Sequence, residues 1–216
     1  MDKDKIDKKD HILEVAERVF SEVGYDGAST RMISGEAGVN MAMLNYYFGS
    51  KEGLFLAIFE HRIATFRSLL ADINNDESTT PWGKIEKYID TYVDRIFSNN
   101  CFQKMLYQEL SVGKRGELSD KINKILLNNV NQFFKIVQDG IDSGDFRKDA
   151  DIQLICATIY GIKNYIMNTP YVSSEMFGFD MKDEKELEEK FKPRLKNYLI
   201  ALLKPYLVIE HDHTNK

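Results

Sequence analysis

The sequence contains few residues that would constrain a fold covalently, and it is short of positive charge. Only two cysteines and four prolines occur among 216 residues, so a disulfide scaffold is excluded and long helices meet few interruptions. Acidic side chains outnumber basic ones, 34 against 29, and the formal net charge is −5. A generally basic surface for nucleic acid is therefore excluded, and any such function must depend on local placement.

Long apolar runs are absent as well. Residues 1–5 are mostly charged and no apolar segment follows them, so no signal peptide is predicted. No apolar stretch is long enough to cross a bilayer. Cys101 and Cys156 lie in apolar helical contexts, which are typical of reduced core cysteines. Together these features predict a cytoplasmic protein without a membrane partner.

Helical periodicity runs through the whole sequence and predicts an all-α fold. Apolar residues recur at spacings of three and four, and no segment alternates as a strand would. Helices are expected at about 7–23, 30–37, 41–48, 51–73, 81–98, 101–111, 117–142, 150–168 and 184–208. The polar segment 74–80 is the expected domain boundary, and whether 169–183 is ordered stays open. Pro193 predicts a kink or a late start in the last helix.

Two short helices separated by a glycine turn predict a helix-turn-helix unit in the N-terminal part. Ser29 or Thr30 can cap the first helix, and Asn40 can cap the second, after a turn at Gly38. In such a unit the second short helix enters the major groove of DNA. The run from Gly38 to Ser50 contains no charged residue, so it would have to read bases through amide and apolar side chains.

Three motifs of this unit carry a family resemblance: Thr30-Arg31-Met32-Ile33, Glu36-Ala37-Gly38-Val39 and the run LNYYFGSKEGLF from Leu44 to Phe55. With them the chain resembles TetR-family transcriptional regulators over about residues 8–60. The resemblance implies an all-α homodimer with an N-terminal three-helix helix-turn-helix DNA-binding domain and a C-terminal helical ligand-binding and dimerisation domain. It implies four parts: 1–50 binds DNA, 51–73 is a connecting helix, 74–208 binds effector and dimerises, and 209–216 is a polar tail.

The resemblance also implies DNA contacts for particular residues. Arg31 and the outward side chains of the second short helix would face bases or nearby backbone, while hydroxyl groups and Lys51 would hold phosphates. The DNA-binding candidates are Ser29, Thr30, Arg31, Asn40, Met41, Ala42, Met43, Asn45, Tyr46, Tyr47 and Lys51. Asn45 can bond an adenine edge and apolar neighbours can pack on thymine methyls, which predicts A·T-rich half-sites. With few cations, affinity should fall only gently with salt.

The C-terminal part should hold the effector and the dimer interface, as the resemblance implies. Its many aromatic residues suggest a small effector that is mostly hydrophobic or aromatic. The ligand-binding candidates are Tyr92, Phe102, Met105, Tyr107, Phe133, Val137 and Tyr160. Side chains of this kind at helical spacing are also typical of a plain core. Apolar stripes in 155–166 and 195–206 are candidates for the dimer interface, although they could equally pack within one subunit.

The predicted function is ligand-responsive transcriptional regulation. A homodimeric repressor would bind a (pseudo)palindromic operator in double-stranded DNA, and a small effector would release it. The alternative is a helix-turn-helix DNA-binding or scaffold protein without a small-molecule effector. No enzyme activity, catalytic residue, cofactor or metal site is predicted, because no nucleophile elbow or phosphate-binding glycine loop occurs. His211 and His213 could bind a metal loosely, but a solvated tail explains them more simply.

Overall fold

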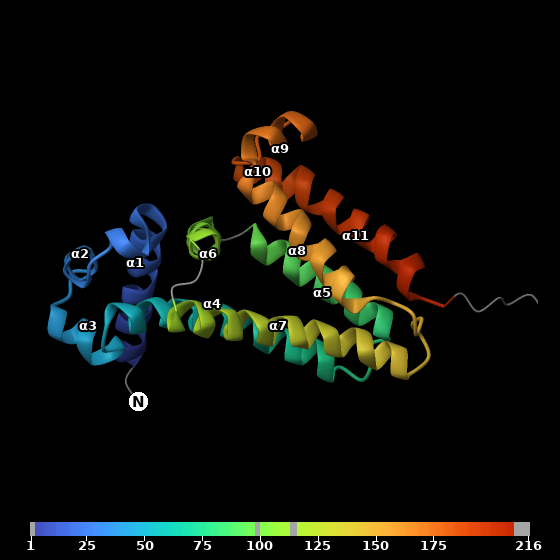
Figure 1. Ribbon diagram of the computed structural model, residues 1–216, viewed down its shortest axis with the longest axis horizontal. Helices are drawn as coiled ribbons and strands as arrows, with labels where there is room; N and C mark the ends of the chain where they lie inside the picture. The colour runs from blue at the N-terminus through green and yellow to red at the C-terminus, as the bar shows by residue number, and fades with distance from the viewer. Residues whose placement is uncertain (1–2, 98–99, 113–115, 210–216) are drawn as a thin grey trace, which may run out of the picture. The chain divides into compact units, whose positions relative to one another are not determined.

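The structure of the protein, a computed structural model, describes residues 3–97, 100–112 and 116–209. The all-α fold is confirmed, because every regular element in these ranges is a helix or a helical turn (Figure 1). The elements are α1 (Lys3–Gly27), α2 (Thr30–Glu36), α3 (Met41–Phe48), α4 (Lys51–Asn75), α5 (Pro81–Ile96), α6 (Asn100–Val112), α7 (Glu117–Asp142), α8 (Ile152–Asn168), α9 (Pro170–Phe177), α10 (Glu184–Glu186), a π-helical turn (Leu187–Phe191) and α11 (Lys192–Leu207).

The described residues form two compact units, and each is considered by itself. Unit 1 contains those within 1–68 and 99–129, and unit 2 contains those within 69–98 and 130–216. Two long helices, α4 and α7, each contribute residues to both units. The units therefore do not coincide with consecutive segments of the chain.

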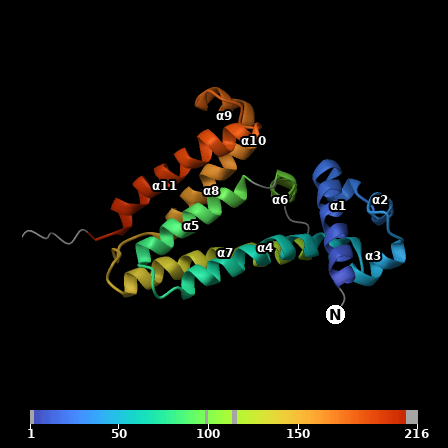
Figure 2. The ribbon, with the colours of Figure 1, turned by 180° about the vertical axis from the view of Figure 1, so that it is seen from behind.

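Unit 1 has an aromatic core between its long helices. Figures 1 and 2 both show α6 beside α1, and these two helices pack against each other. Phe55 meets the ring of Phe20 edge-on at 4.8 Å between centroids and that of Phe59 at 5.2 Å. Phe59 in turn meets Phe102 of α6 at 5.4 Å. Edge-to-face packing of this kind stabilises the core beyond area burial alone and holds α1, α4 and α6 together.

Helix α1 is interrupted near its end, close to where the sequence predicts that it stops. The periodic pattern predicts an end near Val23, and at Gly24 the backbone leaves helical geometry with φ 73° and ψ 171°. Glycine tolerates this positive φ because it has no Cβ. Residues after Gly24 make a further turn to Gly27, and the amide of Ala28 donates to the Gly24 carbonyl at 3.2 Å.

In unit 2 the loop between α7 and α8 is bonded to the end of α11. The ring of Phe146 is fully buried. The Phe146 backbone forms an isolated antiparallel β-bridge with Val208, which follows α11. The amide of Arg147 donates to the Leu207 carbonyl at 2.8 Å, and the Ile209 amide donates to the Asp145 carbonyl at 3.1 Å. These bonds attach the end of α11 to the loop that precedes α8.

Gly140→Ala should destabilise unit 2 by about 1–3 kcal/mol, because a Cβ there would overpack a filled site. That Cβ would stand 2.3 Å from one ring carbon of the buried Phe146. Urea unfolding followed by Trp82, the single tryptophan of the chain and part of unit 2, measures the loss. The control is Gly161→Ala in α8, where a Cβ meets nothing within 4 Å. Equal unfolding midpoints for the two variants would contradict the prediction.

The segment 169–183, which the sequence left open, contains α9. Pro170 stands in its first turn, and Gly178 ends it in the left-handed conformation at φ 77°. The amide of Met181 then donates to Ser174 Oγ at 3.0 Å, which fixes the following turn. The region 184–208 is not one helix but α10, the π-helical turn and α11. The late start predicted from Pro193 is confirmed, because this residue lies in the first turn of α11.

Candidate DNA interface and effector site

The helix-turn-helix of unit 1 forms where the capping residues predict it. Ser29 Oγ accepts a hydrogen bond from the Met32 amide at 3.1 Å, and Asn40 Oδ1 accepts one from the Met43 amide at 2.7 Å. Gly38 takes a φ of 64° in the turn between the helices. These local bonds satisfy the first amides of α2 and α3, so both helices start at fixed residues.

The second helix, α3, is anchored by one side chain and exposes most of the others. Leu44 is fully buried in the core of unit 1, together with Ile33 of α2. Tyr46 is 73% exposed and Met41 is 43% exposed. Exposed large apolar side chains on a short helix are consistent with a surface that meets a partner.

One detail of this surface differs from the predicted pattern of outward residues, because Met43 is half-buried rather than fully outward. Tyr47 is also half-buried, with its ring centroid 5.3 Å from that of Tyr46. Ala42 and Asn45 are exposed as expected. Side chains point in all directions around a helix of eight residues. Because Leu44 points into the core, its position decides which other side chains of α3 lie beside the core and which face outward.

The remaining DNA-binding candidates fall into three states. Arg31 is exposed and Thr30 is half-buried, both in the first turn of α2. The side-chain oxygens of Ser29 and Asn40 are occupied as helix caps. Those two residues can therefore meet DNA only through their remaining groups, which for Asn40 include the Nδ2 donors.

Lys51, the predicted phosphate ligand, is held by a neighbouring ring. Its Nζ lies 4.4 Å from the centroid of Tyr25, and the side chain is half-buried. An ammonium over a tyrosine face is attracted by the ring quadrupole. The cation is thereby positioned at the first residue of α4, directly after α3.

An ion pair joins α1 and α4, two helices of unit 1. Arg62 of α4 donates to both carboxylate oxygens of Glu17 of α1, at 2.6 and 3.2 Å. The Glu17 side chain is 5% exposed and that of Arg62 is 31% exposed. Bidentate geometry with a buried carboxylate fixes α1 and α4 to each other more firmly than a surface pair would.

The predicted effector-binding residues do not gather in one unit. Phe102, Met105 and Tyr107 lie on α6 in unit 1, where the first two are core residues and Tyr107 is 47% exposed. The others lie in unit 2 and are mostly buried: Tyr92, Phe133, Val137 and Tyr160.

The unit 2 candidates surround a cluster of tyrosines. The hydroxyls of Tyr88 and Tyr160 are hydrogen-bonded at 2.8 Å, and the Tyr88 ring lies 4.4 Å from that of Phe133. Tyr92 stacks on Tyr88 at 5.9 Å and meets Tyr160 edge-on at 5.4 Å. Burial raises the pKa of Tyr88 and Tyr92 well above the usual value and that of Tyr160 to about 12. These phenols stay neutral donors and acceptors.

Sequence reasoning missed two residues of this region. Tyr88 is one helical turn before Tyr92 on α5, so their i, i+4 spacing was a signal that could have found it. Lys163 lies three residues after Tyr160 on α8, and burial lowers the pKa of Lys163 to about 8. An ammonium that is costly to keep charged would be stabilised by an anionic group beside it.

Other kinds of site find no support in the part of the chain that the structure describes. Within it, no three His, Cys, Asp or Glu side chains are grouped as a metal would require. His211 and His213 lie outside the described residues. Burial raises the pKa of Cys156 to about 12, so this thiol is a weak nucleophile. None of the helices in the described ranges has both the length and the apolarity to cross a bilayer.

Two family models match the chain. Residues 12–58 match the model described as bacterial regulatory proteins, tetR family. Residues 81–192 match the model described as tetracyclin repressor-like, C-terminal domain. The first match contains α2, α3 and the start of α4, and the second contains most of the helices that follow.

Two curated relatives and a solved structure extend these matches. The chain is 28% identical over 178 residues to the HTH-type transcriptional repressor NicS of Pseudomonas putida, covering 82% of this chain and 84% of NicS. It is 26% identical over 171 residues to the fatty acid metabolism regulator protein of Bacillus subtilis, covering 77% and 87%. The structure of FadR from Bacillus subtilis in complex with stearoyl-CoA superposes with a TM-score of 0.69 at 22% identity, covering 89% of this chain and 96% of FadR.

Proposed function

Because the chain belongs to the tetR family of bacterial regulatory proteins, we propose that it represses transcription as a homodimer bound to a (pseudo)palindromic operator. Residues 1–50 would bind DNA, 51–73 would connect, and 74–208 would bind effector and dimerise, with 209–216 as a tail. The chain is a helix-turn-helix transcriptional regulator, and its family consists of regulators rather than enzymes. We propose that it has no catalytic activity and acts in the cytoplasm, where a bacterial chromosome lies.

The exposed, uncharged face of α3 is the observation that carries this proposal. Leu44 is buried in the core and anchors the helix, while Asn45 and Tyr46 remain exposed. An asparagine amide matches the paired donor and acceptor of an adenine edge in the major groove. Met41 and Ala42, both exposed, offer apolar surface for thymine methyls. The face is therefore suited to A·T base pairs, and exposed Arg31 supplies a cation at its flank.

Exposed apolar side chains on unit 2 support the dimer. Along α8 and α11 some members of the predicted stripes are buried within the unit, among them Ile159 and Leu199. Others remain outside: Tyr165, Tyr198, Leu202 and Tyr206 are all at least 39% exposed. Leu154, just before the first stripe, is also exposed. A two-fold partner would cover such a surface, and two half-site readers require that symmetry.

We propose a long-chain fatty acyl compound, such as an acyl-CoA, as the effector. One relative is named as a regulator of fatty acid metabolism, and FadR of similar fold holds stearoyl-CoA. In unit 2 the tyrosine cluster provides aromatic surface, and Lys163 on α8 provides a cation for an anionic head group. The named ligand of FadR favours this over a helix-turn-helix protein without an effector.

Selection of bound duplexes from a random DNA pool tests both halves of the proposal. We expect A·T-rich half-sites in two-fold arrangement, because Asn45 and its apolar neighbours favour A·T pairs. Stearoyl-CoA should then release the selected duplex in a mobility-shift titration. Recovery of G·C-rich half-sites would contradict the base reading, and a duplex retained at saturating stearoyl-CoA would contradict the effector.

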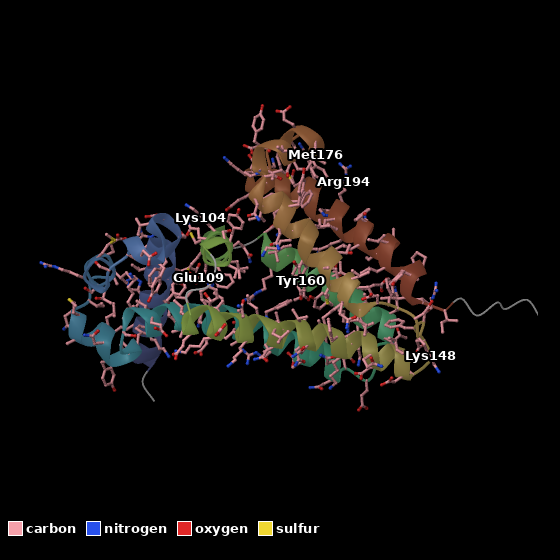
Figure 3. The ribbon with its side chains drawn as sticks, in the orientation of Figure 1. Lys104, Glu109, Lys148, Tyr160, Met176 and Arg194 are labelled. Carbon is pink, nitrogen blue, oxygen red and sulfur yellow. The ribbon has the colours of Figure 1, made fainter. Side chains whose placement is uncertain are left out.

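A matched pair of lysine variants locates the effector. Lys163→Met should raise the stearoyl-CoA concentration for half-release about tenfold, since a charge-assisted contact is lost. Lys148→Met, in the exposed loop before α8 and labelled in Figure 3, should leave it unchanged. Equal release curves for the two variants would place the head group elsewhere.

A further inference from the structure

Methionine is unevenly distributed along the chain, and three of the eight methionines lie in the helix-turn-helix. Met32 belongs to α2, and Met41 and Met43 belong to α3. The other methionines that the structure describes are Met105, Met167, Met176 and Met181. Helix α3, which has no charged residue, therefore carries two thioether groups.

The side chain of Met41 is open to solvent. Met41 is the first residue of α3 and is 43% exposed. Methionine is among the residue types most often fully buried, and Met105 and Met181 follow that rule here. A thioether reacts with an oxidant only where the oxidant can reach the sulfur. Met41 is therefore expected to oxidise readily, and Met105 and Met181 slowly.

An amide lies one helical turn beyond Met41. Asn45 follows it at the i, i+4 spacing that brings two side chains together on one face of a helix. Asn45 is exposed, as Met41 is, so both belong to the face of α3 that is proposed to read A·T base pairs. A thioether is a weak acceptor and leaves the Asn45 amide free for an adenine edge. A strong acceptor at Met41 would not.

From this placement we propose that Met41 is an oxidation site through which peroxide lowers operator affinity, an inference that rests on the operator binding proposed above. The thioether sulfur attacks one oxygen of hydrogen peroxide. An S–O bond forms and the O–O bond breaks, so the sulfur loses two electrons and the peroxide is reduced to water. The product is methionine sulfoxide, a polar and chiral side chain.

The sulfoxide would disturb both kinds of base contact. Its oxygen is an acceptor that a thymine methyl cannot satisfy, so packing on thymine would bury the oxygen without a donor. The same oxygen would accept a hydrogen bond from Asn45 Nδ2 and draw that amide away from adenine. Bound DNA would cover Met41, so the free regulator reacts faster than the operator complex. Sulfoxide reductases reverse the change.

Peptide mass spectrometry of the full chain, treated with hydrogen peroxide, tests the reactivity. Met41 should oxidise at least about fivefold faster than buried Met105. The operator duplex from the random-pool selection should slow the oxidation of Met41. It should not slow that of Met176, an exposed methionine of α9 in unit 2 that is labelled in Figure 3. A Met41 rate equal to that of Met105, or unaffected by a bound duplex, would overturn the proposal.

Operator affinity before and after peroxide treatment tests the consequence. The dissociation constant of the treated chain should rise about thirtyfold, since both half-sites would bury an unpaired acceptor. Sulfoxide reductases should restore it, which separates methionine from cysteine oxidation. Each variant is compared with its own untreated sample. Met41→Leu should limit the rise to about threefold, because leucine keeps the volume but has no sulfur, whereas Met176→Leu should keep the full rise.

The two failures are distinguishable. An untreated chain that retained no duplex would refute the proposed operator binding, and the inference with it. An untreated chain that bound the duplex, but lost equal affinity on oxidation in Met41→Leu and Met176→Leu, would refute the role of Met41 alone.

Discussion

Replacing Arg62 with leucine is expected to destabilise unit 1 by about 3 kcal/mol, because the change removes one partner of a buried ion pair. Glu17 would keep its carboxylate at 5% exposure but lose the two hydrogen bonds from the guanidinium. A charge left uncompensated in a buried site costs more than the pair itself contributed. Native-state hydrogen exchange of the α1 and α4 amides in unit 1 measures the loss, expected as about a hundredfold faster exchange.

Two further variants separate this effect from a general loss of charge. Arg18 and Glu36 also pair, at 3.0 Å, but their side chains are 50% and 38% exposed. Arg18→Leu should therefore cost less than about 1 kcal/mol. Combining Arg62→Leu with Glu17→Leu should restore most of the stability, since no buried charge remains. If Arg62→Leu and Arg18→Leu exchanged equally fast, the buried pair would have no special role.

The helix-turn-helix could be predicted from the sequence because its signals are local. Ser29, Asn40 and Ser50 bond amides three residues further on, so a short stretch of sequence contains both donor and acceptor. The positive φ of Gly38 and Gly49 is likewise a property of single residues. The DNA-facing candidates follow directly from these fixed helix starts.

The effector candidates could not be placed in the same way. Periodicity says that Phe102 and Phe133 are buried, but not which neighbours bury them. Phe102 packs on Phe59 in unit 1, whereas Phe133 packs on Tyr88 in unit 2. Such contacts join residues far apart in the sequence, and α4 and α7 continue through both units without a break. Nothing in the local pattern marks that division.

Helix α9 shows the same limit. Pro170 and Gly178 stand at its two ends, yet a helix of eight residues is too short for a clear apolar stripe. Gly24, in contrast, marks the break in α1 that the sequence predicts, because a positive φ is a property of a single residue.

Gly53→Ala is expected to reduce operator affinity at least about a hundredfold, by displacing α3 rather than by removing a DNA contact. A Cβ at Gly53 would stand 2.1 Å from the carbonyl oxygen of Phe48, the last residue of α3. That oxygen also accepts from the Ser50 amide at 2.8 Å, and Ser50 Oγ accepts from the Gly53 amide at 3.0 Å. The alanine methyl therefore cannot be accommodated without moving backbone at the junction of α3 and α4.

The displacement should be visible apart from unfolding. Amides at the junction, including that of Gly49, which donates to the Asn45 carbonyl at 2.8 Å, should exchange faster, while those of α5 and α11 in unit 2 should not. Gly35→Ala is the control, because its helical backbone has room for a methyl with nothing within 4 Å. It should stabilise α2 by up to about 1 kcal/mol. Unchanged operator affinity for Gly53→Ala would mean that the position of α3 does not govern DNA binding.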